Sequence, residues 1–142
     1  QELNIPKLEI LNKDLTNNEK KVFEIIASRR IFNRNKLQKI CNKMFGMSEK
    51  EFTKIYLNLL KKRYIIKGRR LLKPEILNNS IRRTIFDQVL ISPGIDLRTL
   101  SKKLNLDYRW IQWHILVMED FGYILQKQKN DKILLYPGNS SI

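Results

Sequence analysis

The chain has 142 residues and a net charge of +14, because 28 Lys and Arg stand against 14 Asp and Glu. This excess favours a polyanionic partner, of which nucleic acid is the commonest and a membrane surface the second candidate. The single cysteine, Cys41, excludes an internal disulfide and a Cys-rich metal site, and no run of about 18 apolar residues is present to span a membrane. We therefore expect an intracellular protein, cytoplasmic and associated with the nucleoid.

Apolar spacing in the first half of the chain predicts three helices over 15–30, 35–44 and 48–63 and a small hairpin over 63–74. Thr16 and Glu19 have the spacing of a capping box at the start of the first helix. Ser48 is expected to cap the third helix. The hairpin is predicted because two short apolar runs flank the cationic turn 67–70, and Pro74 ends the second run.

The same order is predicted again in the second half, with helices over 80–91, 96–104 and 107–121 and a longer hairpin over 122–138. Ser80, Asp96 and Asp107 are the expected N-caps of these helices. Gly122 is expected to end the last helix. The sequence therefore predicts an N-terminal arm over 1–14, a first unit over 15–77 and a second unit over 78–142.

Three helices followed by a hairpin are the arrangement of a winged helix-turn-helix unit, whose third helix can occupy a DNA major groove while the hairpin reaches the neighbouring backbone. The run from Ser92 to Ile124 resembles winged-helix transcriptional regulators of the MarR and ArsR kinds from archaea and bacteria. The positions that match in residue or chemical type are Pro93, Gly94, Ile95, Leu97, Leu100, Leu104, Leu106, Ile111, His114, Met118, Glu119, Gly122 and Ile124.

The first half resembles that pattern less closely, and Arg63 stands where relatives carry glycine. The resemblance covers most of the chain. It implies two winged helix-turn-helix units in tandem, a mostly α fold with small β wings, and a nucleic-acid-binding role.

The positive charge is concentrated in the first half. Residues 1–77 hold 19 Lys and Arg against 8 Asp and Glu, a net +11, whereas residues 78–142 hold 9 against 6, a net +3. Each phosphate that a cation neutralises releases condensed counterions, which drives binding and makes it salt-dependent. We therefore expect the first unit to dominate affinity for DNA.

The expected DNA contacts lie at the starts of the second and third helices, at the start of the last helix and in both hairpin turns. They are Arg34, Lys36, Lys50, Thr53, Lys54, Lys67, Arg69, Arg70, Tyr108, Arg109, Gln112, Lys127 and Lys129. The alternative for the lysines is a solvated helix face. Duplex DNA is favoured over RNA because A-form RNA hides its major groove.

The last helix is apolar over most of its circumference. Its core stripe is predicted to be Ile111, Ile115 and Met118. Four further apolar residues lie off that stripe and are expected to form an interface: Trp110, Trp113, Leu116 and Val117. They could stack on nucleic acid, pack against the first unit or form a dimer interface, and packing is favoured because aromatic residues are enriched in interface cores.

The sequence offers no chemistry that points to an enzyme, a cofactor or a metal. His114, the single histidine, has no partner set at ligand spacing and is expected to be partly buried and hydrogen-bonded to backbone. Cys41 is expected to be a packed small apolar group, with redox sensing as a minor alternative.

These patterns predict a tandem winged-helix protein that binds duplex DNA, a transcriptional regulator from an archaeon or a bacterium. One alternative is a winged-helix scaffold in a transcription or replication complex, with the apolar last helix as the partner site. Another is the soluble tail of a membrane-anchored regulator whose anchor lies upstream of Gln1.

Overall fold

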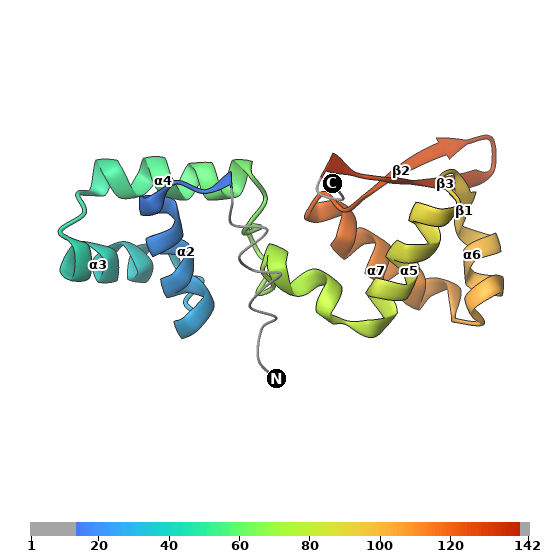
Figure 1. The fold of residues 1–142 in the computed structure, drawn as a ribbon, viewed down its shortest axis with the longest axis horizontal. Helices are drawn as coiled ribbons and strands as arrows, with labels where there is room; N and C mark the ends of the chain where they lie inside the picture. Colours follow the sequence, from blue (N-terminus) through green and yellow to red (C-terminus); the bar gives the residue numbers. More distant parts are fainter. Residues whose placement is uncertain (1–13, 140–142) are drawn as a thin grey trace. The chain divides into compact units, whose positions relative to one another are not determined.

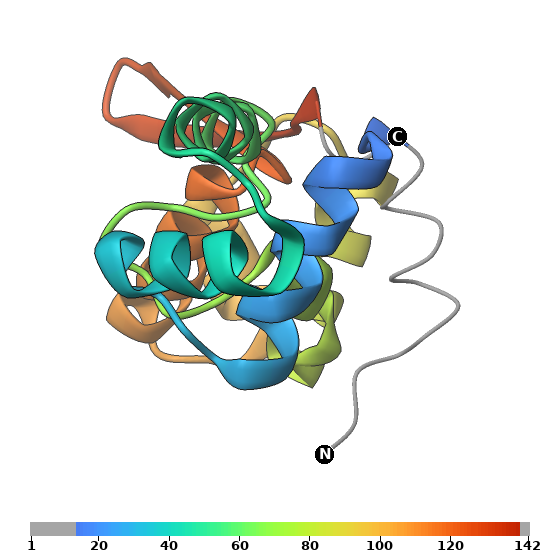
Figure 2. The same ribbon diagram turned by 90° about the vertical axis from the view of Figure 1, so that its left-hand side faces the viewer.

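The computed structural model describes residues 14–139, and the chain divides into two compact units between Pro74 and Glu75 (Figure 1). Of the predicted N-terminal arm, only Asp14 belongs to the described residues. The three helices of the first unit are α2 (Asn17–Arg29), α3 (Arg34–Phe45) and α4 (Glu49–Lys61). Figure 2 looks along α4, and α3 lies across this view, so the short turn between them sets the two helices at a steep angle.

The helix starts in the first unit follow from local capping. The predicted capping box of Thr16 and Glu19 is confirmed, and Ser48 caps α4 as expected. Glu51 completes a second capping box at that end. The apolar faces of the three helices then meet in a common core, whose buried members include Val22, Phe23, Ile26, Leu37, Cys41, Phe52, Ile55 and Leu59.

Glu19 is a buried carboxylate that ties the start of α2 to the end of α4. It accepts hydrogen bonds from Nζ of Lys62 at 2.8 Å and from the side-chain amide of Asn58 at 3.0 Å. Burial alone would raise the pKa of Glu19, but the hydrogen bonds from Lys62, the Thr16 backbone and Asn58 outweigh it and lower that pKa. The charge is therefore retained inside the unit because it is paired.

The small hairpin predicted over 63–74 is present, but without regular strands. A single antiparallel bridge joins Ile65 to Leu72, and the chain then enters the 3₁₀ helix η2 (Lys73–Asn78). Pro74 explains the difference, because proline has no N–H to extend a ladder and its fixed φ suits a helical turn. Residues 66–70, here called the 66–70 loop, connect Ile65 to Leu71.

The second unit contains α5 (Ser80–Ile91), β1 (Ile95–Asp96), α6 (Leu97–Leu104), α7 (Tyr108–Asp120), β2 (Ile124–Lys129) and β3 (Lys132–Pro137). The strands form an antiparallel sheet in the order β1-β3-β2, with Ile95 opposite Leu135 and Gln126 also opposite Leu135 (Figure 1). The predicted second hairpin is confirmed, whereas β1 was not predicted. Asp96 and Asp107 cap α6 and α7 as expected.

The N-cap predicted for α5 was wrong by one residue. The side chain of Asn79, not Ser80, accepts hydrogen bonds from the backbone N–H groups of Ile81 and Arg82, each at 3.0 Å. Asparagine is at least as good an N-cap as serine, and here it comes one position earlier. The core of the second unit includes Ile85, Val89, Leu97, Leu100, Ile111, Ile115, Met118, Ile124 and Leu135.

The same set of contacts occurs within each unit, at the end of its third helix. Tyr64 packs edge-on against Phe23 with ring centroids 5.4 Å apart, and Tyr123 packs in the same way against Phe86 at 5.7 Å. The backbone N–H of each tyrosine closes its helix on the carbonyl five residues earlier, at 3.0 Å in the first unit and 2.9 Å in the second. The tyrosine carbonyl then accepts from Lys73 at 3.0 Å and from Gly138 at 2.8 Å.

Candidate nucleic-acid interface

The outward face of α4 carries the first group of predicted contacts. Its inward face, which includes Phe52 and Leu59, is buried in the core. Lys50 and Lys54 are exposed on the opposite side and Thr53 is half-buried. With Glu49 and Leu57 these three line a shallow depression on the unit's surface. The helix therefore offers two ammonium groups and a hydroxyl to a partner lying along it.

Leu57 is a member of this face that sequence reasoning missed. Its side chain is 57% exposed, although it lies in a helix that is otherwise apolar only on its core side. It follows Lys50, Thr53 and Lys54 at helical spacing, which is the signal that could have identified it. An apolar group at this position can contact the methyl group of thymine in a major groove.

Arg34 links α3 to the same face of α4. Its guanidinium donates to Oγ1 of Thr53 at 2.6 Å and lies over the rings of Phe52 at 5.3 Å and Tyr56 at 5.8 Å. These contacts hold Thr53 in place and occupy part of the guanidinium. Arg34 therefore acts first as a positioning residue, whereas Lys36, two positions along, is exposed.

The 66–70 loop carries the second group of predicted contacts. Lys67 and Arg70 are exposed, Arg69 is half-buried, and Gly68 has the positive φ of 84° that turns the chain. The N–H of Arg69 closes the turn on the carbonyl of Ile66 at 3.0 Å. The loop thus presents its cations on a tight turn rather than at the end of a regular wing.

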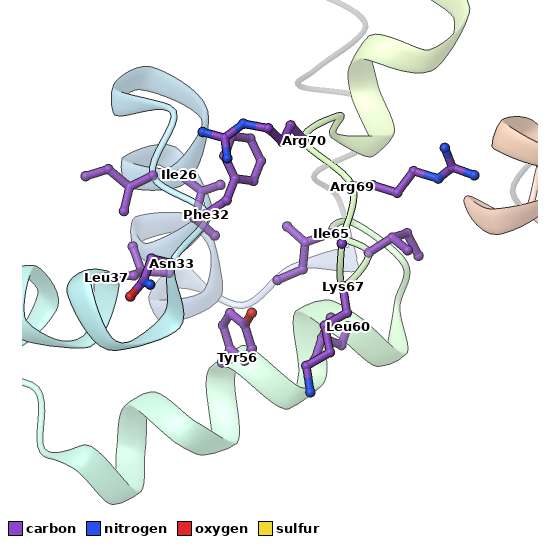
Figure 3. Close-up of a pocket in the computed structure, with 13 residues that line it drawn as sticks. Ile26, Phe32, Asn33, Leu37, Tyr56, Leu60, Ile65, Lys67, Arg69 and Arg70 are labelled. Carbon is purple, nitrogen blue, oxygen red and sulfur yellow. The ribbon is translucent and has the colours of Figure 1, made fainter.

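Two residues that sequence reasoning missed hold this loop against α2. Arg30 donates to the carbonyl of Arg70 at 2.8 Å, and the guanidinium groups of Arg30 and Arg70 lie over the ring of Phe32 at 5.1 and 5.0 Å. Figure 3 shows Arg70 against the Phe32 ring. Cation–π contacts leave the guanidinium edges able to bind phosphate oxygens, so this stack orders the loop without neutralising it.

In the second unit, the predicted contacts lie at the start of α7 and on the β2–β3 hairpin. Arg109 is exposed and Gln112 half-buried, while Tyr108 lies beneath the guanidinium of Arg98 at 5.1 Å. On the hairpin, Lys127 and Lys129 are both exposed. These groups could face a common partner, but they are fewer and more widely spaced in sequence than the cations of the first unit.

Acidic residues weaken the charge of the second hairpin. Lys132 lies 3.9 Å from a carboxylate oxygen of Asp96, and Asp131 is exposed in the turn. Hydrogen bonds from Thr99 lower the pKa of Asp96, with smaller contributions from the charges of Lys132 and Lys102, so the carboxylate stays ionised.

The four residues predicted as an interface do not all lie on one surface. Trp110, Trp113 and Leu116 are 46%, 48% and 45% exposed and form what we call the α7 patch. Val117 is fully buried at 0%, so the prediction that it lies outside the core was wrong. Val117 lies beside the predicted core stripe of α7, and in this unit the core extends far enough around the helix to cover it.

His114 is buried beneath the α7 patch. Its Nδ1 lies 3.4 Å from a guanidinium nitrogen of Arg82, which itself donates from Nε to the carbonyl of Ile76 at 2.7 Å. Because a guanidinium can only donate, Nδ1 is the acceptor and the ring proton lies on Nε2. The expected backbone hydrogen bond of His114 was therefore wrong, and the partner is a side chain.

The rings of Trp110 and Trp113 lie against the imidazole of His114, with centroids 5.4 and 5.0 Å away. Nε2 is buried and has no hydrogen-bond partner among the described residues. Burial, followed by the positive charge of Arg82, lowers the pKa of His114 below its ordinary value. The ring is therefore neutral near pH 7.

Within residues 14–139 there is no group of three or more His, Cys, Asp or Glu side chains placed to hold a metal ion. Cys41 is buried as expected, and desolvation raises the pKa of its thiol. No helix in the described part of the chain is both long and apolar enough to cross a bilayer.

Comparison with known proteins finds one informative similarity. A stretch of 65 residues, 46% of the chain, is 34% identical to an uncharacterized HTH-type transcriptional regulator of Methanocaldococcus jannaschii, and that stretch spans 17% of the regulator's length. No family model matches the chain, and no solved structure matches it. The mostly helical units and the small antiparallel sheet are compatible with a winged helix-turn-helix fold.

Proposed function

We propose that the chain is a transcriptional regulator that binds duplex DNA through two winged helix-turn-helix units, over 15–77 and 78–142. The first unit supplies most of the affinity. The observation that carries this proposal is the outward face of α4, where Lys50, Thr53 and Lys54 project away from a packed core. A helix in a major groove needs donors of this kind on one side and a rigid support on the other.

The 66–70 loop supports the same function. It follows α4 after four residues and bears Lys67, Arg69 and Arg70, which suit phosphate oxygens or a minor groove. With α4 in the major groove, α7 and the β2–β3 hairpin would make the equivalent contacts in the second unit, through Tyr108, Arg109 and Gln112 and through Lys127 and Lys129.

The contacts that recur in each unit favour an arrangement of two similar units in tandem. The Phe23–Tyr64 and Phe86–Tyr123 pairs and the hydrogen bonds around both tyrosines occur at corresponding places in each unit. The similarity to an HTH-type transcriptional regulator over 65 residues agrees with a DNA-binding role.

Duplex binding at several salt concentrations tests this function. Fluorescence anisotropy with a labelled random-sequence duplex should give an affinity that falls steeply between roughly 50 and 200 mM salt. Lys50→Ala with Lys54→Ala should weaken binding and lower the salt slope, because each lysine lost removes one positive charge close to the phosphates that border the groove. The matched control is Lys102→Ala with Lys103→Ala, which removes the same charge from an exposed part of α6 and should change binding little.

Two results would reject the proposal. One is an absence of duplex binding at low salt. The other is equal losses from the α4 and α6 double variants, which would show that net charge alone, and no particular face, drives association.

A protein-interaction scaffold is the second candidate function. The α7 patch favours it, because three large apolar side chains on one helix are a typical protein-binding feature. In that case Trp113→Ala would abolish a stable complex and leave duplex binding unchanged. A homodimer through this patch would appear as a monomeric Trp113→Ala variant in sedimentation analysis of the full chain.

A further inference from the structure

The outward face of α4 carries one apolar side chain among its cations. Leu57 is 57% exposed. Lys54 precedes it by three positions and Lys61 follows it by four, so an exposed lysine lies one turn away on either side of the leucine. A lone exposed leucine needs no functional explanation, but this one occupies the middle of the surface proposed to enter a major groove.

The third helix of the second unit has a leucine at the corresponding place. Leu57 is the ninth residue after the N-cap of α4, and Leu116 is the ninth residue after the N-cap of α7. Leu116 is exposed as well, at 45%. In α7, however, Trp113 stands where α4 has Lys54. An exposed leucine at this position is thus a feature of both helices, and the charge around it makes Leu57 the one suited to DNA.

The surroundings of Leu57 add further apolar carbon. Long side chains in a helix lean toward the preceding turn, and Leu57 lines a shallow depression there together with Thr53 and Lys54. Oγ1 of Thr53 accepts a hydrogen bond from the guanidinium of Arg34 at 2.6 Å, which fixes the rotamer of Thr53 and therefore the place of its methyl group. Leu57 and this methyl group present neighbouring apolar atoms along the depression.

An alkyl side chain can recognise one kind of group on the base edges of a major groove. Adenine, guanine and cytosine offer hydrogen-bond donors and acceptors there, whereas thymine adds a methyl group at C5. A leucine placed against a donor or an acceptor deprives it of water without replacing the hydrogen bond, which is unfavourable. Against the thymine methyl group the same side chain buries apolar area, which is favourable. The base that suits Leu57 is therefore thymine.

A protein partner suits this face of α4 less well than DNA. Lysine is depleted in the cores of protein interfaces, because its charge must be removed from water there. Lys50, Lys54 and Lys61 are all exposed on the same face as Leu57. A phosphate backbone on either side of a groove would pair with these lysines while the leucine faces the bases.

We infer that Leu57 is a specificity-determining residue of the proposed DNA interface and reads the C5 methyl group of thymine. This inference rests on the proposed function, because it requires the outward face of α4 to lie in a major groove. Lys50 and Lys54 supply charge that acts on any sequence, whereas Leu57 favours duplexes with thymine at the position it faces.

Two duplexes that differ only in methyl groups test this reading. One contains only A·T pairs, and the other has the same sequence with deoxyuridine in place of every thymidine. Anisotropy titrations of the full chain at one low salt concentration should give a Kd about fourfold lower for the thymidine duplex, which is the ratio expected for burying one methyl group. A G·C duplex with 5-methylcytosine should also bind more tightly than its unmethylated form, because both methyl groups occupy the same place in the groove.

Variants at Leu57 assign the methyl preference to this side chain. Leu57→Gln has a similar length and helix propensity but is polar, so it should bind the thymidine and deoxyuridine duplexes with nearly equal Kd. Leu57→Met remains apolar and should keep the preference. Neither variant should change the salt slope, because no charge is lost. The matched control is Leu90→Ala, which removes an exposed leucine of α5 outside the proposed contacts and should leave the preference intact.

Three results would overturn the inference. If the wild-type chain binds the thymidine and deoxyuridine duplexes equally well, Leu57 does not read a methyl group, and the proposed function still stands. If the preference persists in Leu57→Gln with an unchanged circular dichroism spectrum, the methyl group is read elsewhere. A wild-type chain that binds neither duplex at low salt rejects the proposed function and this inference with it.

Discussion

Leu116 and Val117 are neighbours on α7 with opposite environments. Leu116 is 45% exposed and Val117 is fully buried. Val117→Ala should lower the free energy of unfolding by about 2 kcal/mol, because it removes buried methyl groups and leaves a small cavity. Leu116→Ala should change it by less than about 0.5 kcal/mol. Urea unfolding followed by circular dichroism measures both, and similar losses would mean that α7 buries a different face.

His114 predicts a pH dependence of stability in the second unit. Its pKa is lowered in the folded state by burial and by the charge of Arg82, so the folded ring binds protons less readily than the unfolded one. The neutral ring therefore contributes stability that is complete above the unfolded pKa of about 6.5 and is lost as the pH falls toward the lower folded value.

The measurement is the free energy of unfolding at several pH values between about 7 and 5, above the range in which most carboxylates take up protons. His114→Gln cannot become charged and should remove this part of the pH dependence. If the wild-type chain and the variant lose stability in parallel, another group is responsible. The pKa values of Glu19 and Asp96 are also lowered, so the stability that these two carboxylates contribute is lost only at more acidic pH.

At the scale of an element, the chain leaves α4 and α7 through the same backbone conformation but with a different residue in it. Both are followed by a residue with positive φ, Arg63 at 62° and Gly122 at 82°. A side chain in this conformation costs about 1–2 kcal/mol, which glycine avoids. We expect Gly122→Ala to destabilise the chain by about 1 kcal/mol and Arg63→Gly to stabilise it by a few tenths to 1 kcal/mol. Thermal unfolding measures both changes, and a destabilised Arg63→Gly variant would mean that the contacts of this arginine outweigh its backbone strain.

Helix positions were predictable because their signals are local. The capping boxes at Thr16 and Ser48 and the caps at Asp96 and Asp107 depend on residues three positions apart, and the structure confirms each cap. The strand β1 was missed because Ile95 pairs with Leu135, far along the chain, and two residues carry no period of their own.

The candidate site was predictable only in part for the same reason. The exposure of Lys50 and Lys54 follows from helical spacing, which the sequence contains. The stack of Arg30 and Arg70 on Phe32 and the hydrogen bond of Arg34 to Thr53 join segments that only tertiary folding brings together. Sequence reasoning could assign charge to these residues but not their partners.

At the scale of the whole molecule, the charge is unequally divided. The 66–70 loop and the β2–β3 hairpin each carry three cations, but residues 1–77 have a net charge of +11 and residues 78–142 a net charge of +3. We expect glutamine at Lys67, Arg69 and Arg70 to weaken duplex binding strongly and to lower the salt slope by about three.

Glutamine at Lys127, Lys129 and Lys132 is the matched comparison in the second unit. Its effect should be smaller, because Asp96 and Asp131 already offset part of this charge. Anisotropy titrations at several salt concentrations compare the two triple variants. Equal losses would contradict dominance of the first unit and indicate that both units contribute similarly.

Both tryptophans of the chain lie against His114 on α7, and the first unit has none. The natural indole emission of this protein is therefore a built-in optical probe of a single site. A titrant that quenches or shifts this emission acts on the second unit, and one that binds while leaving the spectrum unaltered acts elsewhere. Localising a ligand to one half of the chain thus requires neither a label nor a mutation.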